Sequence, residues 1–151
     1  MWRDLGIALL VLAGYYIVGL AGAVVLQGHE AKASQTFAQR APHSALELCV
    51  WIAVAISAGF CEEFVFRGYL QVQCRRITGS VAAAVVIQAL TFGAAHGYES
   101  WALMLTIFPI GLLFGAIAAW RKSLAPTMIA HSAADSVGIV VSFLEHVTRR
   151  I

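Results

Sequence analysis

Residues 101–120 have the sequence WALMLTIFPIGLLFGAIAAW, a stretch of 20 residues without a charged side chain. A helix needs about 20 mainly apolar residues to cross the hydrocarbon core of a bilayer. Tryptophans stand at both ends of this stretch, as membrane interfaces favour, and Arg121 and Lys122 follow it. The stretch therefore predicts a membrane-spanning helix.

The composition of the whole chain agrees with a membrane protein. Of its 151 residues, 60% are hydrophobic and 12% are charged, against about 45–50% and about 25% in soluble domains. The net charge is only +2 and no basic run is present, so we expect no nucleic-acid partner. The three cysteines lack CxxC spacing, which argues against a disulfide framework or a thiolate zinc site.

Four further apolar segments alternate with polar ones. The longest polar segment, residues 27–44, carries His, Glu, Lys and Arg side chains that must reach an aqueous face. Residues 68–77 mix Gln and Arg with apolar side chains, which indicates an interfacial amphipathic helix. We predict an all-α fold, a polytopic transmembrane helix bundle of about five spans at residues 5–26, 45–61, 81–95, 101–120 and 126–144.

The first of these spans has an alternative interpretation as a cleavable signal peptide. Residues 5–26 form an uncharged run of 22 residues, whereas the apolar part of a signal peptide usually has ~7–15. Further spans follow, and no clear positive charge precedes the run. A retained helix is therefore favoured, and we expect residues 1–151 to form a single membrane-embedded domain.

Five ionisable side chains lie in or at the ends of the apolar segments: Glu62, Glu63, His96, His131 and Asp135. A charge at the centre of a bilayer costs about 2.5–3.5 kcal/mol, so three lipid-exposed carboxylates would cost on the order of 10 kcal/mol. Structural ion pairing is the alternative for any one of them. It does not account for carboxylates and histidines on three separate segments, so we expect these side chains to converge inside the bundle.

Helical spacing divides the acidic pair into two roles. Glu63 and Arg67 are four residues apart with the acid first, which is the favoured arrangement for an ion pair. Glu62 points about 100° away from Glu63 around the helix and is the better candidate for a general base. His131 and Asp135 share one helix face, and Phe92 stands four residues before His96 as an aromatic wall of the pocket.

Three motifs occur in order along the apolar segments: EEFVFR at residues 62–67, FGAAH at 92–96 and HSAAD at 131–135. In these motifs the chain resembles the CPBP intramembrane proteases, which include type II CAAX prenyl proteases and bacteriocin-processing or bacteriocin-immunity proteins. The resemblance implies that Glu62 and His96 activate water for attack on a peptide carbonyl. It also implies that His131 and Asp135 stabilise the oxyanion or hold the catalytic assembly.

The last motif carries aspartate where the family has Asn or Asp, and this choice affects the chemistry. An asparagine amide donates a hydrogen bond to an oxyanion, whereas an ionised aspartate only accepts. Asp135 must therefore be protonated, orient His131 or bind a metal. Glu62, His96 and His131 are the candidate ligands of a Zn²⁺ ion with an open water position. The HExxH pattern is absent, and the question of a metal cofactor stays open.

We therefore predict a membrane-embedded endopeptidase that acts on a peptide or a membrane-associated protein. Its catalytic core would span about residues 45–144, and it would sit among the lipids of the plasma (inner) membrane of a prokaryote. Two alternatives belong to other classes: a non-catalytic immunity-type or scaffold protein, and a proton-coupled transporter that uses the same buried Glu and His side chains. A transporter more often shows inverted repeats and broken helices in matching halves.

Overall fold

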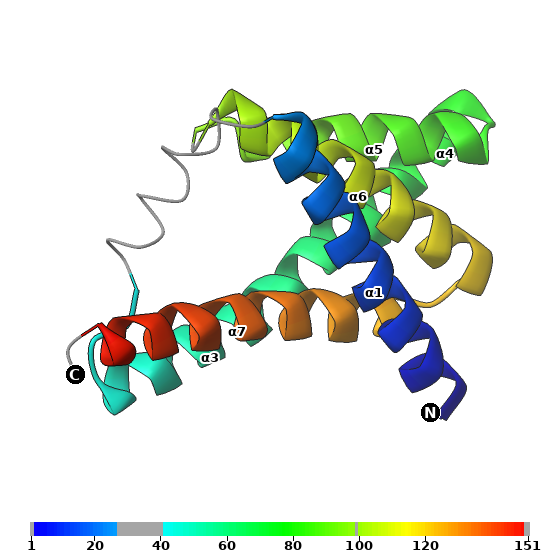
Figure 1. The fold of residues 1–151 in the computed structure, drawn as a ribbon. Helices are drawn as coiled ribbons and strands as arrows, with labels where there is room; N and C mark the ends of the chain where they lie inside the picture. The colour runs from blue at the N-terminus through cyan, green and yellow to red at the C-terminus, as the bar shows by residue number, and fades with distance from the viewer. Residues whose placement is uncertain (1, 27–40, 99, 150–151) are drawn as a thin grey trace.

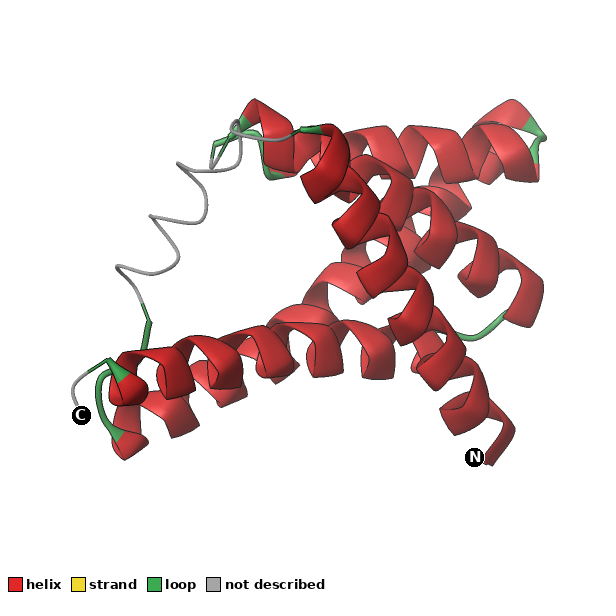
Figure 2. Ribbon diagram, in the orientation of Figure 1, coloured by secondary structure: helices red, strands yellow, loops and turns green. Residues whose placement is uncertain are grey.

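The computed structural model describes residues 2–26, 41–98 and 100–149, and these residues contain helices and no strand (Figures 1 and 2). The all-α prediction is confirmed. Residues 27–40, which make up most of the predicted polar loop, lie outside the described part. In chain order the helices are α1 (Trp2–Val25), α3 (Ala45–Glu63), η1 (Phe64–Leu70), α4 (Gln71–Thr78), α5 (Val81–Ala95), α6 (Trp101–Arg121) and α7 (Ala125–Thr148).

Four of the described helical runs are long and apolar enough to cross a membrane. They are α1, the continuous run Ala45–Thr78, α6 and α7, with 24, 34, 21 and 24 residues. The fifth predicted span, α5, has only 15 residues. At 1.5 Å per residue α5 is about 22 Å long, which is short of the ~30 Å hydrocarbon core. The predicted transmembrane helix bundle is confirmed, with four helical runs long enough to cross a membrane and one shorter apolar helix among the described residues.

The helix predicted after Arg67 is present as α4, and the backbone continues into it from α3 without a break. Helix α3 continues through η1, a π-helix, into α4. The N–H of Gln71 donates to the carbonyl of Phe66, five residues earlier, which is the π-helical pattern. The acidic pair consequently lies inside a helical run of 34 residues and not at the end of a span.

The helix ends follow the local sequence. Gly79 ends α4 with a φ of 68°, a left-handed conformation that glycine adopts without steric cost. Ser80 then caps α5 by accepting a hydrogen bond from the N–H of Ala83. Gly79 and Ser80 thus separate α4 from α5. Helix α7 carries Pro126 in its first turn, where no backbone donor is needed.

The helices pack in pairs around one core. Helix α3 lies along α7, α5 lies along α6, and α1 crosses both α6 and α7 (Figure 1). Core residues come from three of these helices, namely Val11, Ile110, Phe114 and Ala130. Packing of α5 on α6 uses Gly111, where an added Cβ would lie 3.0 Å from the Cα of Ala89.

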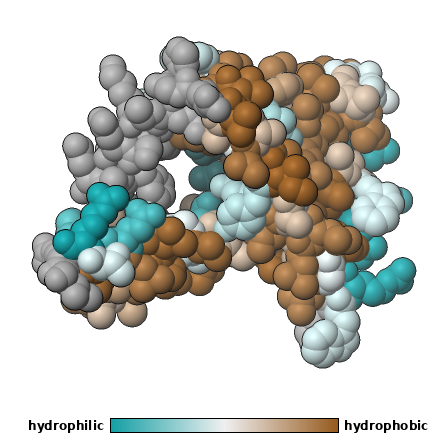
Figure 3. All heavy atoms as spheres, viewed as in Figure 1, coloured by the Kyte–Doolittle hydropathy of each residue, from teal (hydrophilic) through white to brown (hydrophobic). Residues whose placement is uncertain are grey.

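The outer surface is mostly apolar, as expected for helices that face lipid. On α1 the exposed residues include Leu9, Leu10, Ile17 and Leu20, and apolar residues cover most of the face shown in Figure 3. In the most apolar stretch of each candidate span, only 11% to 39% of the residues are buried within the protein. Exposure of so much apolar surface to water is unfavourable, whereas the lipid tails of a bilayer cover it. The protein is an integral membrane protein.

Candidate active site

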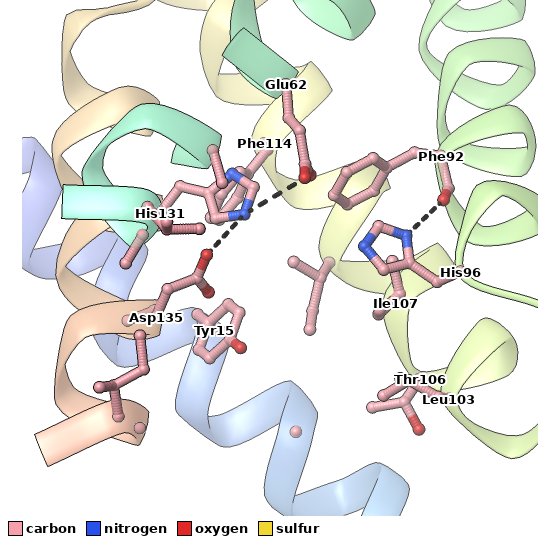
Figure 4. A pocket seen from close by; sticks show the side chains of 18 of the residues that line it. Tyr15, Glu62, Phe92, His96, Leu103, Thr106, Ile107, Phe114, His131 and Asp135 are labelled. Atoms are coloured by element: carbon pink, nitrogen blue, oxygen red, sulfur yellow. Dashed lines mark hydrogen bonds and ion pairs between the residues drawn. The ribbon is translucent and has the colours of Figure 1, made fainter. Parts of the chain in front are cut away.

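One cavity of about 590 Å³ collects the predicted site residues. Glu62 from α3, His96 from the end of α5, and His131 and Asp135 from α7 all line it (Figure 4). The rest of the lining is mainly apolar and aromatic, including Trp51, Ile107 and Phe114. The structure therefore brings four of the five predicted residues to one cavity. Glu63, the fifth, is not among its lining residues and is fully buried behind it.

Glu63 forms the ion pair that its spacing to Arg67 predicts. The Arg67 Nη1 donates to Glu63 Oε1 at 2.8 Å, and both side chains are fully buried. Three rings surround the guanidinium, whose central carbon lies 4.2 Å from the ring centroid of Phe92, 5.4 Å from that of Phe114 and 6.0 Å from that of Phe66. Aromatic rings attract such a cation. We call Glu63, Arg67, Phe66, Phe92 and Phe114 the arginine cluster.

The arginine cluster explains how the π-helix is held. Glu63 is the last residue of α3, and Arg67 lies within η1, so the ion pair spans the junction where the helical pattern changes. A buried charge is tolerated only when it is paired and hydrogen-bonded. The pairing thus restrains the backbone immediately beside Glu62.

His131 connects the arginine cluster to the cavity. Its Nδ1 lies 3.2 Å from Glu63 Oε1, and its Nε2 lies 3.6 Å from Asp135 Oδ2 and 3.8 Å from Glu62 Oε2. Carboxylate oxygens flank both ring nitrogens, and only an imidazolium donates from both. His131 is 7% exposed, so the orientation of its ring is set by these partners and by the Phe114 ring, whose centroid is 5.7 Å away.

Glu62 differs from its neighbour in exposure, because the side chain of Glu63 is fully buried whereas that of Glu62 lines the cavity. Its side chain is 32% exposed, and its Oε2 has no hydrogen-bond partner among the described residues. Figure 4 shows the carboxylate pointing into the cavity toward His131. Glu62 can therefore accept a proton or a hydrogen bond from a molecule bound in the cavity.

His96 presents one ring nitrogen to the cavity. Its Nδ1 lies 2.9 Å from the carbonyl oxygen of Phe92. Because a carbonyl only accepts, Nδ1 carries a proton, and Nε2 of the neutral ring is an acceptor. Figure 4 shows this second nitrogen directed toward the open centre of the cavity. Phe92 therefore does more than form a wall: its carbonyl orients His96, and its ring packs on both His96 and Arg67.

A close contact between α3 and α7 sets the distance between the helices that carry Glu62 and His131. A Cβ added to Gly59 would lie 2.6 Å from the backbone nitrogen of Ser132 and 2.9 Å from its Cα, closer than packed atoms allow. The Ser132 hydroxyl also donates to the carbonyl of Ile56 at 3.3 Å. Gly59 stands three residues before Glu62, and Ser132 follows His131, so this contact brings the two side chains together.

Tyr15 is a lining residue outside all three motifs. It comes from α1 and faces the cavity beside Asp135 (Figure 4). The sequence offers one weak signal for it, since Tyr15 and Tyr16 are the only tyrosines between residues 5 and 26. Their spacing alone does not say which of them faces inward.

The candidate metal ligands do not form a metal site in this arrangement. Across residues 2–26, 41–98 and 100–149, no group of three or more His, Cys, Asp or Glu side chains is placed to hold a metal ion. His96 directs Nδ1 to a carbonyl, and His131 directs both nitrogens toward carboxylates.

A comparison with models of known protein families shows the family to which the chain belongs. The family model described as type II CAAX prenyl endopeptidase Rce1-like matches residues 44–137, which is more than half of the chain and includes all three motifs. No curated protein and no solved structure matches it. The resemblance found in the three motifs is confirmed, and the chain belongs to the type II CAAX prenyl endopeptidase Rce1-like family.

Proposed function

We propose that this protein is an intramembrane endopeptidase that hydrolyses a peptide bond in a membrane-associated protein or peptide. The observation that carries the proposal is the unequal state of the acidic pair. Glu63 is fully buried and pairs with Arg67 and His131, whereas the side chain of Glu62 is 32% exposed and lines the cavity. Family membership supports the same class of reaction.

The proposed chemistry uses side chains alone. The Glu62 carboxylate takes a proton from a water molecule while the water oxygen attacks the peptide carbonyl carbon. The electron pair of the C=O bond moves to the carbonyl oxygen. When the carbonyl re-forms, the C–N bond breaks and the leaving nitrogen takes the proton from Glu62. His96 orients the water by accepting a hydrogen bond at Nε2.

The cavity also restricts the substrate. Its lining is mainly apolar, and a charged or strongly polar peptide segment would lose hydration there without compensation. An apolar segment beside the scissile bond gains from the same burial. The proposed substrate is therefore a membrane-associated chain with apolar residues near the cleavage site, and we place the enzyme in the plasma (inner) membrane of a prokaryote.

The test compares purified wild-type protein with the Glu62→Gln variant in lipid nanodiscs. A panel of internally quenched peptides, with apolar C-terminal segments and with or without a farnesylated cysteine, supplies the substrates. We expect cleavage of at least one peptide by wild-type protein and a loss of about 10²–10⁴-fold in Glu62→Gln, the range of general-base contributions.

The control for this test is Glu47→Gln, which alters a glutamate in the first turn of α3, outside the cavity lining. It should cleave like wild type. A proteomic comparison of cell membranes that hold either wild-type or Glu62→Gln protein extends the search to natural substrates. Identical protein termini in both membranes, together with no peptide cleavage, would reject the protease and favour a non-catalytic scaffold.

A further inference from the structure

Helix α1 lies outside the segment that matches the family model, yet it supplies a side chain to the cavity. The family match covers residues 44–137, and α1 ends at Val25. Tyr15 from this helix lines the cavity together with Glu62, His96, His131 and Asp135. In Figure 4 its ring lies next to Asp135 and its hydroxyl is directed into the cavity.

The position of Tyr15 is set by close packing of α1 on α6. A Cβ added to Gly14 would lie 2.9 Å from a methyl group of Leu113, so the two helices approach closely beside Tyr15. Val11, one turn earlier, is 2% exposed and belongs to the core. The Tyr15 ring itself packs on Phe114, with centroids 6.4 Å apart. A ring held in this way presents its hydroxyl in one direction.

The proposed hydrolysis creates a need that the motif residues meet poorly. The tetrahedral intermediate carries a negative oxygen, which requires hydrogen-bond donors aimed at it. Ionised Glu62 and Asp135 only accept hydrogen bonds. His131 Nδ1 lies 3.2 Å from Glu63 Oε1, and its Nε2 faces the other two carboxylates at 3.6 and 3.8 Å, so both ring nitrogens are directed toward carboxylate oxygens.

Tyr15 has the chemistry that is missing. A phenol is uncharged and donates a hydrogen bond without a change of protonation state. Among the described residues, none forms a hydrogen bond with the Tyr15 hydroxyl. Figure 4 shows the Tyr15 ring next to Asp135, at the motif position that holds Asn or Asp in the family and where Asn would supply an amide donor.

We propose that Tyr15 is a catalytic residue whose hydroxyl donates a hydrogen bond to the oxyanion of the tetrahedral intermediate. This inference rests on the proposed protease function. The hydroxyl keeps its proton throughout: it donates while the electron pair of the C=O bond resides on oxygen, and it releases the oxygen when the carbonyl re-forms and the C–N bond breaks. Aspartate at position 135 is then compatible with catalysis because the neutral donor comes from α1.

The experiment measures kcat and KM of Tyr15→Phe with a peptide that wild-type protein cleaves and Glu62→Gln does not. The change removes one oxygen atom and keeps the ring, so the packing on Phe114 and the melting temperature should be unchanged. We expect kcat to fall about 100-fold, as for the loss of one oxyanion donor, with KM unchanged. The matched control is Tyr16→Phe, whose side chain is 43% exposed and does not line the cavity.

A double variant tests the link to Asp135. In the Tyr15→Phe background, Asp135→Asn introduces an amide donor at the motif position. A kcat at least about tenfold higher in the double variant than in Tyr15→Phe supports a shared role at the oxyanion. A purely structural defect caused by Tyr15→Phe would not be relieved by that amide.

The outcomes separate this inference from the proposed function. If wild type cleaves, Glu62→Gln does not, and Tyr15→Phe keeps the kcat of Tyr16→Phe, the role of Tyr15 is overturned while the protease stands. A Tyr15→Phe variant with reduced kcat and no recovery from Asp135→Asn also overturns the oxyanion role. If wild-type protein cleaves no peptide and alters no membrane protein, the protease is rejected and the role of Tyr15 with it.

Discussion

The two glutamates of the acidic pair are adjacent in sequence and lie in opposite surroundings. Glu63 belongs to the arginine cluster, in which an ion pair of 2.8 Å is enclosed by three phenylalanine rings. Glu62 borders a cavity of about 590 Å³, and its side chain is 32% exposed. The comparison separates two requirements of the site: a buried ion pair holds the backbone, and a carboxylate that borders the cavity stays accessible for chemistry.

The largest expected effect comes from breaking the arginine cluster. Arg67→Ala leaves Glu63 buried beside His131 without its main counter-charge. Removal of one partner from a buried ion pair costs about 3–5 kcal/mol, so we expect a large loss of stability and, with it, of activity. Thermal unfolding in nanodiscs measures this loss.

The control for Arg67→Ala is Arg76→Ala, an exposed arginine in the last turn of α4. Its removal should shift the melting temperature little, since exposed charges contribute about 0–1 kcal/mol. Equal melting temperatures for the two variants would mean that the arginine cluster does not hold the helix.

A smaller effect is expected where α3 meets α7. Gly59→Ala introduces a methyl group against the backbone of Ser132, and the helices must move apart. Overpacking of this kind costs about 1–3 kcal/mol. The movement also separates Glu62 from His131, so turnover should fall by more than the loss of folded protein alone would cause. Unfolding and turnover are measured on the same preparation.

Gly6→Ala is the matched change on α1, where nothing lies within 4 Å of the added Cβ. It should be neutral or slightly stabilising, because alanine favours a helix by about 1 kcal/mol over glycine. A Gly59→Ala protein as active as Gly6→Ala would show that the close contact is not needed for the site.

The smallest effect is expected at Asp135. If Glu62 and His96 activate water directly, Asp135→Asn keeps activity within about tenfold of wild type, because the amide supplies a donor at the oxyanion. Chelation should then leave turnover of both proteins unchanged. The measurement is turnover of wild-type and Asp135→Asn protein after chelation and after zinc replacement, with bound metal quantified.

The same measurement has a contrary outcome. If Asp135 orients a zinc-bound histidine, the amide should weaken metal binding about 10–100-fold. Stoichiometric zinc in active wild-type protein, lost with activity on chelation and restored with it, would reject the direct mechanism.

Much of the fold follows from local sequence. The tryptophans at residues 101 and 120 predict the limits of α6 to within one residue. The energetic cost of buried carboxylates predicts that separate helices contribute to one site, and the i,i+4 spacing of Glu63 and Arg67 predicts their contact. These features depend on composition and on helical geometry, and both can be derived from the sequence without knowledge of tertiary contacts.

Other features depend on tertiary contacts that no short motif reveals. No residue between Ala45 and Thr78 marks the switch from α-helix to π-helix, because the switch accompanies burial of Arg67 among rings from other helices. The close approach of Gly59 and Ser132 requires the register between two helices. Tyr15 lies far from the motifs, and only the packing of α1 on α6 brings it to the cavity.

The division of labour between the glutamates is tested most directly by comparing Glu62→Gln and Glu63→Gln in the same nanodiscs, with turnover and melting temperature measured for each. The account predicts that Glu62→Gln keeps the wild-type melting temperature and loses turnover. It predicts that Glu63→Gln, which deprives Arg67 of a buried counter-charge, lowers both. An equal loss of thermal stability in the two variants would contradict the assignment of chemistry to Glu62 and structure to Glu63.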